Sequence, residues 1–326
     1  MAFQAERLKQ LDCCHCGGQV DVSTARPLST TVCPLCLSEL RVPAKVGSML
    51  ITGILGQGAG SIVYEATDRV LGRRVAVKVM KNRKPDDKPC SQSGVDEARS
   101  LLLISHPNVV KVHAIDTRQG EPCIIMELLP GDSLKQQVDK NQPLEETKAL
   151  RIALDVANGL MATNRRGLLH LDVKPGNIMF DSKGTAKLLD FGFAAFDLDT
   201  EPSEIVGTPY YVSPELVQQQ VPDRRSDMYS LGATLYHLLT GQPPFTGKTI
   251  KKILSARLKR ETPPDPRDLA PALHEKTAEL VMQLMAEEPD DRYRTYEQFI
   301  VDLRKTLDAV HQRDRRAKPK TQITFE

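Results

Sequence analysis

The strongest constraint on the fold of this chain is a set of five short motifs in a fixed order. Residues 56–63 read GQGAGSIV, residues 75–78 read VAVK, and residues 170–177 read HLDVKPGN. Residues 190–192 (DFG) and 213–215 (SPE) follow. Lysine suits phosphate groups, and carboxylate or amide oxygens suit hard cations. The residue types in these motifs therefore suit a phosphorylated ligand and a metal ion.

The glycine-rich motif is a weak signal when it is taken alone. Glycines let a backbone approach phosphate oxygens and present N–H groups to them. A glycine hairpin without any ligand explains residues 56–63 equally well. A dinucleotide-binding fold is not favoured because no helix follows directly, and a P-loop is excluded because no Gly-Lys-Ser/Thr follows.

Apolar periodicity divides the long central part of the chain in two. β-branched runs between turn residues predict five strands, at residues 49–55, 61–66, 74–80, 109–115 and 123–128. Helical spacing predicts helices at residues 96–104, 144–165, 226–239 and 278–285. A β-rich part followed by an α-rich part is an α+β arrangement.

In their order and spacing, the five motifs resemble those of the protein kinase family. The resemblance covers about residues 50–310, and stretches such as HPNVV, MELLPGDSL and GTPYYVSPE are similar to the eukaryotic-like serine/threonine kinases of bacteria. It implies a bilobal protein kinase fold, with a β-rich N-lobe and an α-helical C-lobe. Phosphoryl transfer in this family depends on positioning and on charge neutralisation.

The resemblance implies which side chains hold ATP and its metal ion. Lys78, held by Glu97, would grip the α- and β-phosphates. Asp190 would chelate Mg²⁺ (or Mn²⁺), and Asn177 would hold a second ion.

The resemblance also implies the residues that act on the acceptor. Asp172 would orient or accept the proton of the attacking hydroxyl, and Lys174 would offset charge on the γ-phosphate. Thr208 matches the substrate loop of serine/threonine kinases. Together with the lysine two residues after Asp172, it favours serine or threonine over tyrosine as acceptor.

A nucleotide pocket is implied around the glycine-rich loop and the strands beside it. Its N-lobe members would be Leu55, Gly56, Gln57, Gly58, Ala59, Gly60, Ser61, Val63 and Ala76. Met126 would lie behind the adenine, while the backbones of Glu127 and Leu129 would bond its edge. Farther along the chain, Glu215 and Arg292 resemble a buried structural ion pair, and Asp227 resembles a brace for the catalytic loop.

Two positions depart from the family pattern. Ser61 replaces the third glycine, although Gly60 precedes it, so ATP binding is expected to survive. Leu171 stands where the family usually has an arginine that reads an activation-segment phosphate. The chain is therefore of the non-RD type (His-Leu-Asp), and we expect no switching by a phosphate that docks there.

Five of the seven cysteines fall within residues 13–36. Two Cys-x-x-Cys pairs supply four thiolates at the spacing of a tetrahedral, structural Zn²⁺ site, namely Cys13, Cys16, Cys33 and Cys36. Cys14 and His15 are further donors, so the choice of ligands stays open. A segment of about 45 residues has too small a core to fold unaided, so metal would stabilise it. The alternatives are reduced cysteines in a disordered leader, or a redox site.

Composition excludes few classes of protein. The formal net charge is only +2, which does not favour nucleic acid as a partner. No apolar run approaches the roughly 20 residues of a membrane span, and the N-terminus lacks the apolar core of a signal peptide. We therefore expect a soluble, cytoplasmic protein. No internal repeat is evident in the sequence.

These patterns predict a zinc-ribbon-like module at residues 1–45, a protein kinase domain at 48–310 and a loose basic tail at 311–326. The leading hypothesis is a serine/threonine kinase that acts on proteins, including itself. One alternative is a pseudokinase that binds nucleotide as a scaffold, and another is a nucleic-acid-binding protein that uses the ribbon and the tail. The zinc module would dock a partner or substrate, or pack on the N-lobe and hold Glu97.

Overall fold

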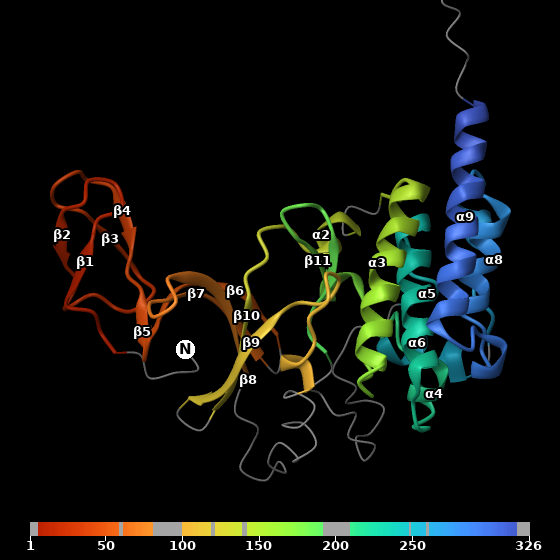
Figure 1. Ribbon diagram of the computed structural model, residues 1–326, viewed down its shortest axis with the longest axis horizontal. Coiled ribbons are helices and arrows are strands. Elements are labelled where there is room, and N and C mark those ends of the chain that lie inside the picture. The colour runs from red at the N-terminus through yellow and green to blue at the C-terminus, as the bar shows by residue number, and fades with distance from the viewer. Residues whose placement is uncertain are drawn as a thin grey trace, which may run out of the picture. The chain divides into compact units, whose positions relative to one another are not determined.

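The computed structural model has two compact units (Figure 1). The first comprises Met1–Leu103 and Lys111–Leu128, and the second comprises Ile104–Val110 and Leu129–Glu326. Within them the structure describes residues 6–58, 61–80, 100–118, 121–138, 142–191, 209–247, 249–258 and 261–317.

A six-stranded antiparallel sheet forms the body of the first unit. Its strand order is β5 (Ala44–Val46), β6 (Met49–Gln57), β7 (Ser61–Asp68), β8 (Arg73–Met80), β10 (Glu121–Glu127) and β9 (Val112–Arg118). Antiparallel neighbours can be joined by tight turns, which explains why most neighbours in the sheet are also consecutive in the chain. The five predicted strands correspond to β6–β10, whereas β5 is too short to show a period.

The two faces of this sheet differ, because successive residues of a strand point to opposite sides. Val75, Val77 and Val79 of β8 join one buried apolar cluster with Ile51 and Tyr64. The residues between them, Ala76 and Lys78, point to the other face.

Two small hairpins precede the sheet and form an internal repeat. β1 (Gln10–Asp12) pairs with β2 (Gln19–Asp21), and β3 (Thr30–Val32) pairs with β4 (Glu39–Arg41), in the same register twenty residues later. In each, the first cysteine donates its N–H to the carbonyl at the end of the turn, at 2.8 and 2.9 Å. The expectation of no repeat was wrong, because the copies share the cysteine spacing and the strand pattern but few identical residues.

Helices make up most of the second unit. They are α2 (Leu134–Val138), α3 (Glu146–Asn164), α4 (Pro214–Val217), α5 (Arg224–Thr240), α6 (Ile250–Leu258), α7 (Pro266–Leu269), α8 (Glu275–Leu284) and α9 (Tyr296–Ala317). Between α3 and α4 lie the 3₁₀ turn η1 (Pro175–Asn177) and a hairpin of β11 (Ile178–Phe180) and β12 (Ala186–Leu188), and the 3₁₀ turn η3 (Pro289–Asp291) precedes α9. The predicted helices at 144–165, 226–239 and 278–285 correspond to α3, α5 and α8. Of the predicted helix at 96–104, residues 100–102 are helical and 96–99 lie outside the described residues.

Helix α5 is central to the second unit. It packs against α3 and α8, and α3 also packs against α9 (Figure 1). A Cβ on Gly232 would lie 2.7 Å from the Cβ of Leu284, so glycine allows α5 and α8 to approach closely. Asp223 caps the start of α5 by accepting the N–H of Arg225, and Gly241 ends it in the left-handed conformation.

Helix α9 continues to Ala317, so residues 311–317 are helical where the sequence predicted a loose tail. The helix continues because of a side-chain contact that the local sequence does not predict. Arg313 pairs with the buried carboxylate of Glu146 at 2.8 Å and donates to the carbonyl of Ala272 at 2.8 Å. Residues 318–326 lie outside the described part of the chain. Among the described helices, none has the length and apolar character that a membrane crossing requires.

Candidate active site

A buried carboxylate on α5 anchors the HLDVKPGN segment. Asp227 accepts the N–H of His170 at 2.8 Å and the N–H of Leu171 at 2.7 Å, one with each oxygen. Burial raises the pKa of Asp227, and both His170 and the N–H donors oppose that rise. The two bonds hold Leu171 in the left-handed conformation, with φ of 57°. They therefore fix the backbone immediately before Asp172.

Three side chains of this segment converge. The carboxylate of Asp172 lies 2.7 Å from the ammonium of Lys174 and accepts the side-chain N–H of Asn177 at 2.8 Å. Asn177 also donates to the backbone carbonyl of Asp172 at 2.9 Å, which closes the loop on itself. The Asp172 side chain remains 42% exposed, so a hydroxyl group from another molecule can reach it.

Leu189, the residue before Asp190, is hydrogen-bonded to the same loop. The N–H of Leu189 donates to the carbonyl of Asn177 at 2.9 Å, and Nε2 of His170 lies 2.8 Å from the carbonyl oxygen of Leu189. The rings of His170 and Phe191 lie 4.6 Å apart. Asp190 itself has φ of 53°, a left-handed conformation that is uncommon for non-glycine residues but that aspartate adopts more readily than most.

Sequence reasoning missed the residue that positions the strand before Asp190. Asn108 is buried, donates its side-chain N–H to the carbonyl of Ala186 at 2.9 Å, and accepts the N–H of Leu188 at 2.9 Å. These bonds hold β12. The only signal was the asparagine of the HPNVV stretch, to which the resemblance alone assigns no role.

Lys78 lies on the face of the first unit's sheet that does not carry the main apolar cluster. It is directly opposite Val63 on β7 and Ile124 on β10, while Ala76 is opposite Met126. Directly opposed residues point to one face, so Val63, Ala76, Lys78 and Met126 share it. Lys78 is 8% exposed, and a buried ammonium requires partners.

The glycine-rich motif forms the turn between β6 and β7. The N–H of Gly58 donates to the carbonyl of Ser61 at 2.9 Å, with Leu55, Gly56 and Gln57 leading into the turn. Leu55 is 49% exposed. The predicted positions that lie outside the described residues are Ala59, Gly60, Glu97, Gly192 and Thr208.

Of the two residues predicted to bond adenine, Glu127 is the last residue of β10 and Leu129 follows the strand. The N–H of Glu127 donates to the carbonyl of Lys111 at 2.9 Å, and its carboxylate accepts the N–H of Lys111 at 2.7 Å. The backbone carbonyl of Glu127 takes no part in either bond. Leu129 is buried just beyond the strand.

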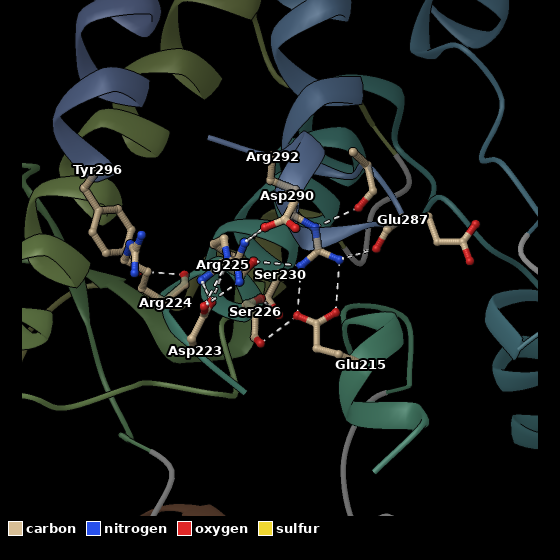
Figure 2. A network of polar contacts seen from close by, with 11 residues as sticks. Glu215, Asp223, Arg224, Arg225, Ser226, Ser230, Glu287, Asp290, Arg292 and Tyr296 are labelled. Carbon is tan, nitrogen blue, oxygen red and sulfur yellow. Dashed lines mark hydrogen bonds and ion pairs between the residues drawn. The ribbon is translucent and has the colours of Figure 1, made fainter. Parts of the chain in front are cut away.

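The predicted ion pair between Glu215 and Arg292 is confirmed (Figure 2). The guanidinium binds both carboxylate oxygens, at 2.8 and 3.0 Å, and Ser226 donates its hydroxyl to Glu215 at 2.6 Å. Arg292 also donates to the backbone carbonyls of Arg225 and Ala286. The network joins α4, α5 and η3, and so has a structural role.

The two cysteine pairs come together at the tips of the N-terminal hairpins. Cys13 and Cys36 have their sulfurs 3.6 Å apart, and those of Cys16 and Cys33 are 3.7 Å apart. All four sulfurs lie within 4.8 Å of one another. A tetrahedral ion with bonds of about 2.3 Å to sulfur needs sulfurs about 3.8 Å apart, so the group fits such an ion.

The surroundings of the thiols shift the pKa of two of these cysteines in opposite directions. The backbone of Gly18 lowers the pKa of Cys16, but the hydrogen bonds of Cys36 and Cys13 together with burial outweigh it and raise that pKa to about 12. Hydrogen bonds from the side chain and backbone of Ser38 lower the pKa of Cys36 to about 6, which favours the thiolate that a metal needs. Cys14 and His15 are exposed and lie outside the four-sulfur group.

Comparison with known proteins finds similarity for most of the chain, beginning at residue 50. A model described as "Protein kinase domain" matches residues 50–301. A probable serine/threonine-protein kinase of Corynebacterium efficiens, CE0033, is 35% identical over 263 residues, which are 76% of this chain and 40% of that protein. Serine/threonine-protein kinase PrkC of Bacillus subtilis is 30% identical over 273 residues, which are 83% of this chain and 42% of PrkC. The chain thus spans about two fifths of the length of these relatives.

Among solved structures, the kinase domain of Mycobacterium tuberculosis PknI is similar with a TM-score of 0.65 and 25% identity. The similarity covers 80% of this chain and 96% of that one. The family model matches the chain from residue 50 onwards, so the cysteine hairpins precede the matched region.

Proposed function

We propose that this chain, which belongs to the protein kinase family, transfers the γ-phosphoryl group of ATP to serine and threonine hydroxyls of proteins. The observation that carries the proposal is the convergence of Asp172, Lys174 and Asn177 on one another, in a loop anchored by buried Asp227. The names of the relatives support the choice of acceptor. So does the lysine two residues after Asp172.

The chemistry of the acceptor side follows from the surroundings of Asp172. Its carboxylate is held in place by Lys174 and Asn177, so it is positioned to orient a substrate hydroxyl or accept its proton. Lys174 carries the positive charge that would offset the charge of the transferring group. By the family resemblance, Thr208, which lies outside the described residues, would also belong to the acceptor site.

Magnesium (or manganese) and ATP fit the donors that the chain provides. Asn177 donates through its amide nitrogen to Asp172, so its amide oxygen can face a cation, and Asp190 adds a carboxylate. When bound, the metal ion would neutralise phosphate charge. Lys78, with Glu97 as its proposed partner, would grip the α- and β-phosphates, on the same face as Ala76 and Met126.

Leu171 has no group that can bind phosphate, which supports a kinase that is not switched by phosphate docking at this position. We expect phosphatase treatment to leave the rate of peptide phosphorylation nearly unchanged. A large fall in that rate would contradict this part of the proposal.

The direct test of the proposed function is autophosphorylation and peptide phosphorylation by the purified chain with Mg-ATP. We expect activity in the wild type and a loss of about 10³-fold or more in Asp172→Asn, because both positioning and proton transfer would be lost. Asp190→Asn serves as a second inactive variant that excludes a contaminating kinase. Equal phosphorylation by wild type and both variants would favour the pseudokinase alternative.

We also propose that Cys13, Cys16, Cys33 and Cys36 hold a structural zinc ion. The sulfur spacing supports this assignment, and all four positions of the tetrahedron are taken by protein, so no catalytic position remains. The metal content of the purified chain tests it, and iron instead of zinc would favour the redox alternative.

A further inference from the structure

The cysteine hairpins begin and end on the same strand of the first unit's sheet. At their start, the N–H of Glu6 donates to the carbonyl of Lys45 at 2.9 Å, and their side chains form an ion pair at 2.6 Å. At their end, the chain runs directly into β5, which contains Lys45. Both ends of residues 6–43, hereafter the cysteine module, are therefore fixed to β5.

Strand β5 is an integral part of the sheet, although the sequence assigned most of it to the module. It pairs with β6, with Ala44 opposite Ile51. Ala44 and Val46 are buried in the cluster on the face opposite Lys78, hereafter the back face.

The linker between the two hairpins also contacts the back face. Leu28 packs against its apolar cluster and donates its N–H to the carbonyl of Val42 at 2.7 Å. Leu28 has φ of 64°, a left-handed conformation that is unfavourable for a residue with a Cβ. Such a conformation persists only where the surrounding structure fixes it. Here the described partners of Leu28 are Val42, which follows β4, and the apolar cluster of the back face.

Apart from the thiol group, the hairpins share a small apolar cluster, against which Leu8, Leu11 and Ala25 also pack. Their buried cluster contains six residues, and two of these are proposed metal ligands, Cys13 and Cys33. The other four are Val20, Val22, Leu40 and Val42. So small a core does not stabilise a fold by itself, and a metal ion supplies the missing free energy. Each hairpin gives two sulfurs, so the ion joins the two copies of the repeat.

We infer that the metal ion, through the cysteine module, stabilises the sheet that carries Lys78. Loss of the ion would separate the hairpins and release Leu28 and β5 from the back face. In β8 the back-face residues Val77 and Val79 flank Lys78 directly, so a looser back face would disturb the lysine. The inference rests on the proposed zinc site and adds that its occupancy controls the stability of the nucleotide-binding sheet.

Hydrogen exchange measured by mass spectrometry tests the inference on the full chain. Removal of the metal by a chelator should make amides of β5–β8 exchange about tenfold faster or more, because local opening becomes easier. Amides of α5 in the second unit should exchange at an unchanged rate. Cys16→Ser should behave like the chelated protein, and Cys14→Ser, outside the thiol group, should behave like the wild type.

A second variant separates the link from the metal site. Leu28→Ser keeps all four thiols but removes the apolar contact with the back face. We expect it to retain about one zinc ion per chain and yet to show faster exchange in β5–β8.

The outcomes distinguish the two proposals. Wild-type protein without any bound metal would overturn both the zinc site and the inference. Bound zinc whose removal leaves exchange in β5–β8 unchanged would overturn the inference alone. Neither result depends on kinase activity.

Discussion

Leu37 adopts a backbone conformation that is unfavourable for its residue type. Its φ is 58°, and 78% of its surface is exposed, so its side chain gains little from burial. The equivalent position in the first hairpin is Gly17, with φ of 72°. A residue with a Cβ in this region costs about 1–2 kcal/mol, whereas glycine adopts it readily.

We therefore predict that Leu37→Gly stabilises the cysteine module. The expected gain is about 0.5–1 kcal/mol, because the extra freedom of glycine in the unfolded chain offsets part of the relieved strain. Slower release of the metal to a chelator would measure it.

The matched control is Gly17→Leu, since no atom lies within 4 Å of the Cβ that it would add. It should speed metal release through strain alone. Equal release rates in both variants and the wild type would show that the left-handed residues carry no cost.

At the scale of secondary structure, the Glu215–Arg292 pair joins α4 to α5 and η3 (Figure 2). Both side chains are almost fully buried. Burial by itself would raise the pKa of Glu215, but hydrogen bonds and the charge of Arg292 outweigh it and lower the pKa below its usual 4.5. The pair therefore stabilises the fold above pH 4.5, and this contribution is lost as the pH falls below 4.5 through the lowered pKa.

We predict that Glu215→Gln lowers the free energy of unfolding of the second unit by about 3–5 kcal/mol at pH 7, because Arg292 keeps a buried charge without its partner. Urea unfolding at several pH values measures this loss. The difference between wild type and variant should shrink as the pH falls below 4.5.

Glu297→Gln is the control for that experiment. Glu297 pairs with Arg165 on the surface, where both side chains are more than half exposed, so its removal should change stability little. A difference between wild type and Glu215→Gln that stays constant with pH would contradict the assignment of acid sensitivity to this pair.

At the scale of the whole molecule, periodic and local patterns were sufficient to predict most of the fold. The alternation of Val75, Val77 and Val79 predicts β8, and the motif around Lys78 marks its polar position. Contacts between distant side chains leave no such pattern. In the sequence, Arg313 belongs to a polar, basic run. In the structure it pairs with buried Glu146, the first residue of α3.

The candidate site also contains both residues that local motifs predict and residues whose roles depend on contacts between distant parts of the chain. The sequence predicts Asp172, Asn177 and Asp190 as site residues because each lies in a short motif with fixed neighbours. The sequence does not predict the role of Asn108, because its hydrogen bond to Ala186 joins residues 78 positions apart. The repeat of the hairpins was also missed, because it is a repeat of register and hydrogen bonding more than of residue identity.

The proposed ligands of Mg-ATP lead to a prediction for the whole chain. Lys78 belongs to the first unit and Asp190 to the second. A ligand that binds only folded protein stabilises it by about 2.7 kcal/mol at a hundredfold excess over Kd. We expect Mg-ATP to raise the unfolding temperature by about 5 °C or more, since each kcal/mol corresponds to roughly 2–4 °C in domains of this size.

The metal-dependent share of that shift can be isolated with variants from each unit. Asp190→Asn should abolish the difference between ATP with magnesium and ATP with a chelator, because the carboxylate that would bind the ion is gone. Lys78→Met should reduce the shift under both conditions, since its proposed contact is with the phosphates themselves. If Asp190→Asn kept the full magnesium-dependent shift in a calorimetric scan, Asp190 would not be the metal ligand, and the ion would have to be held by other oxygens.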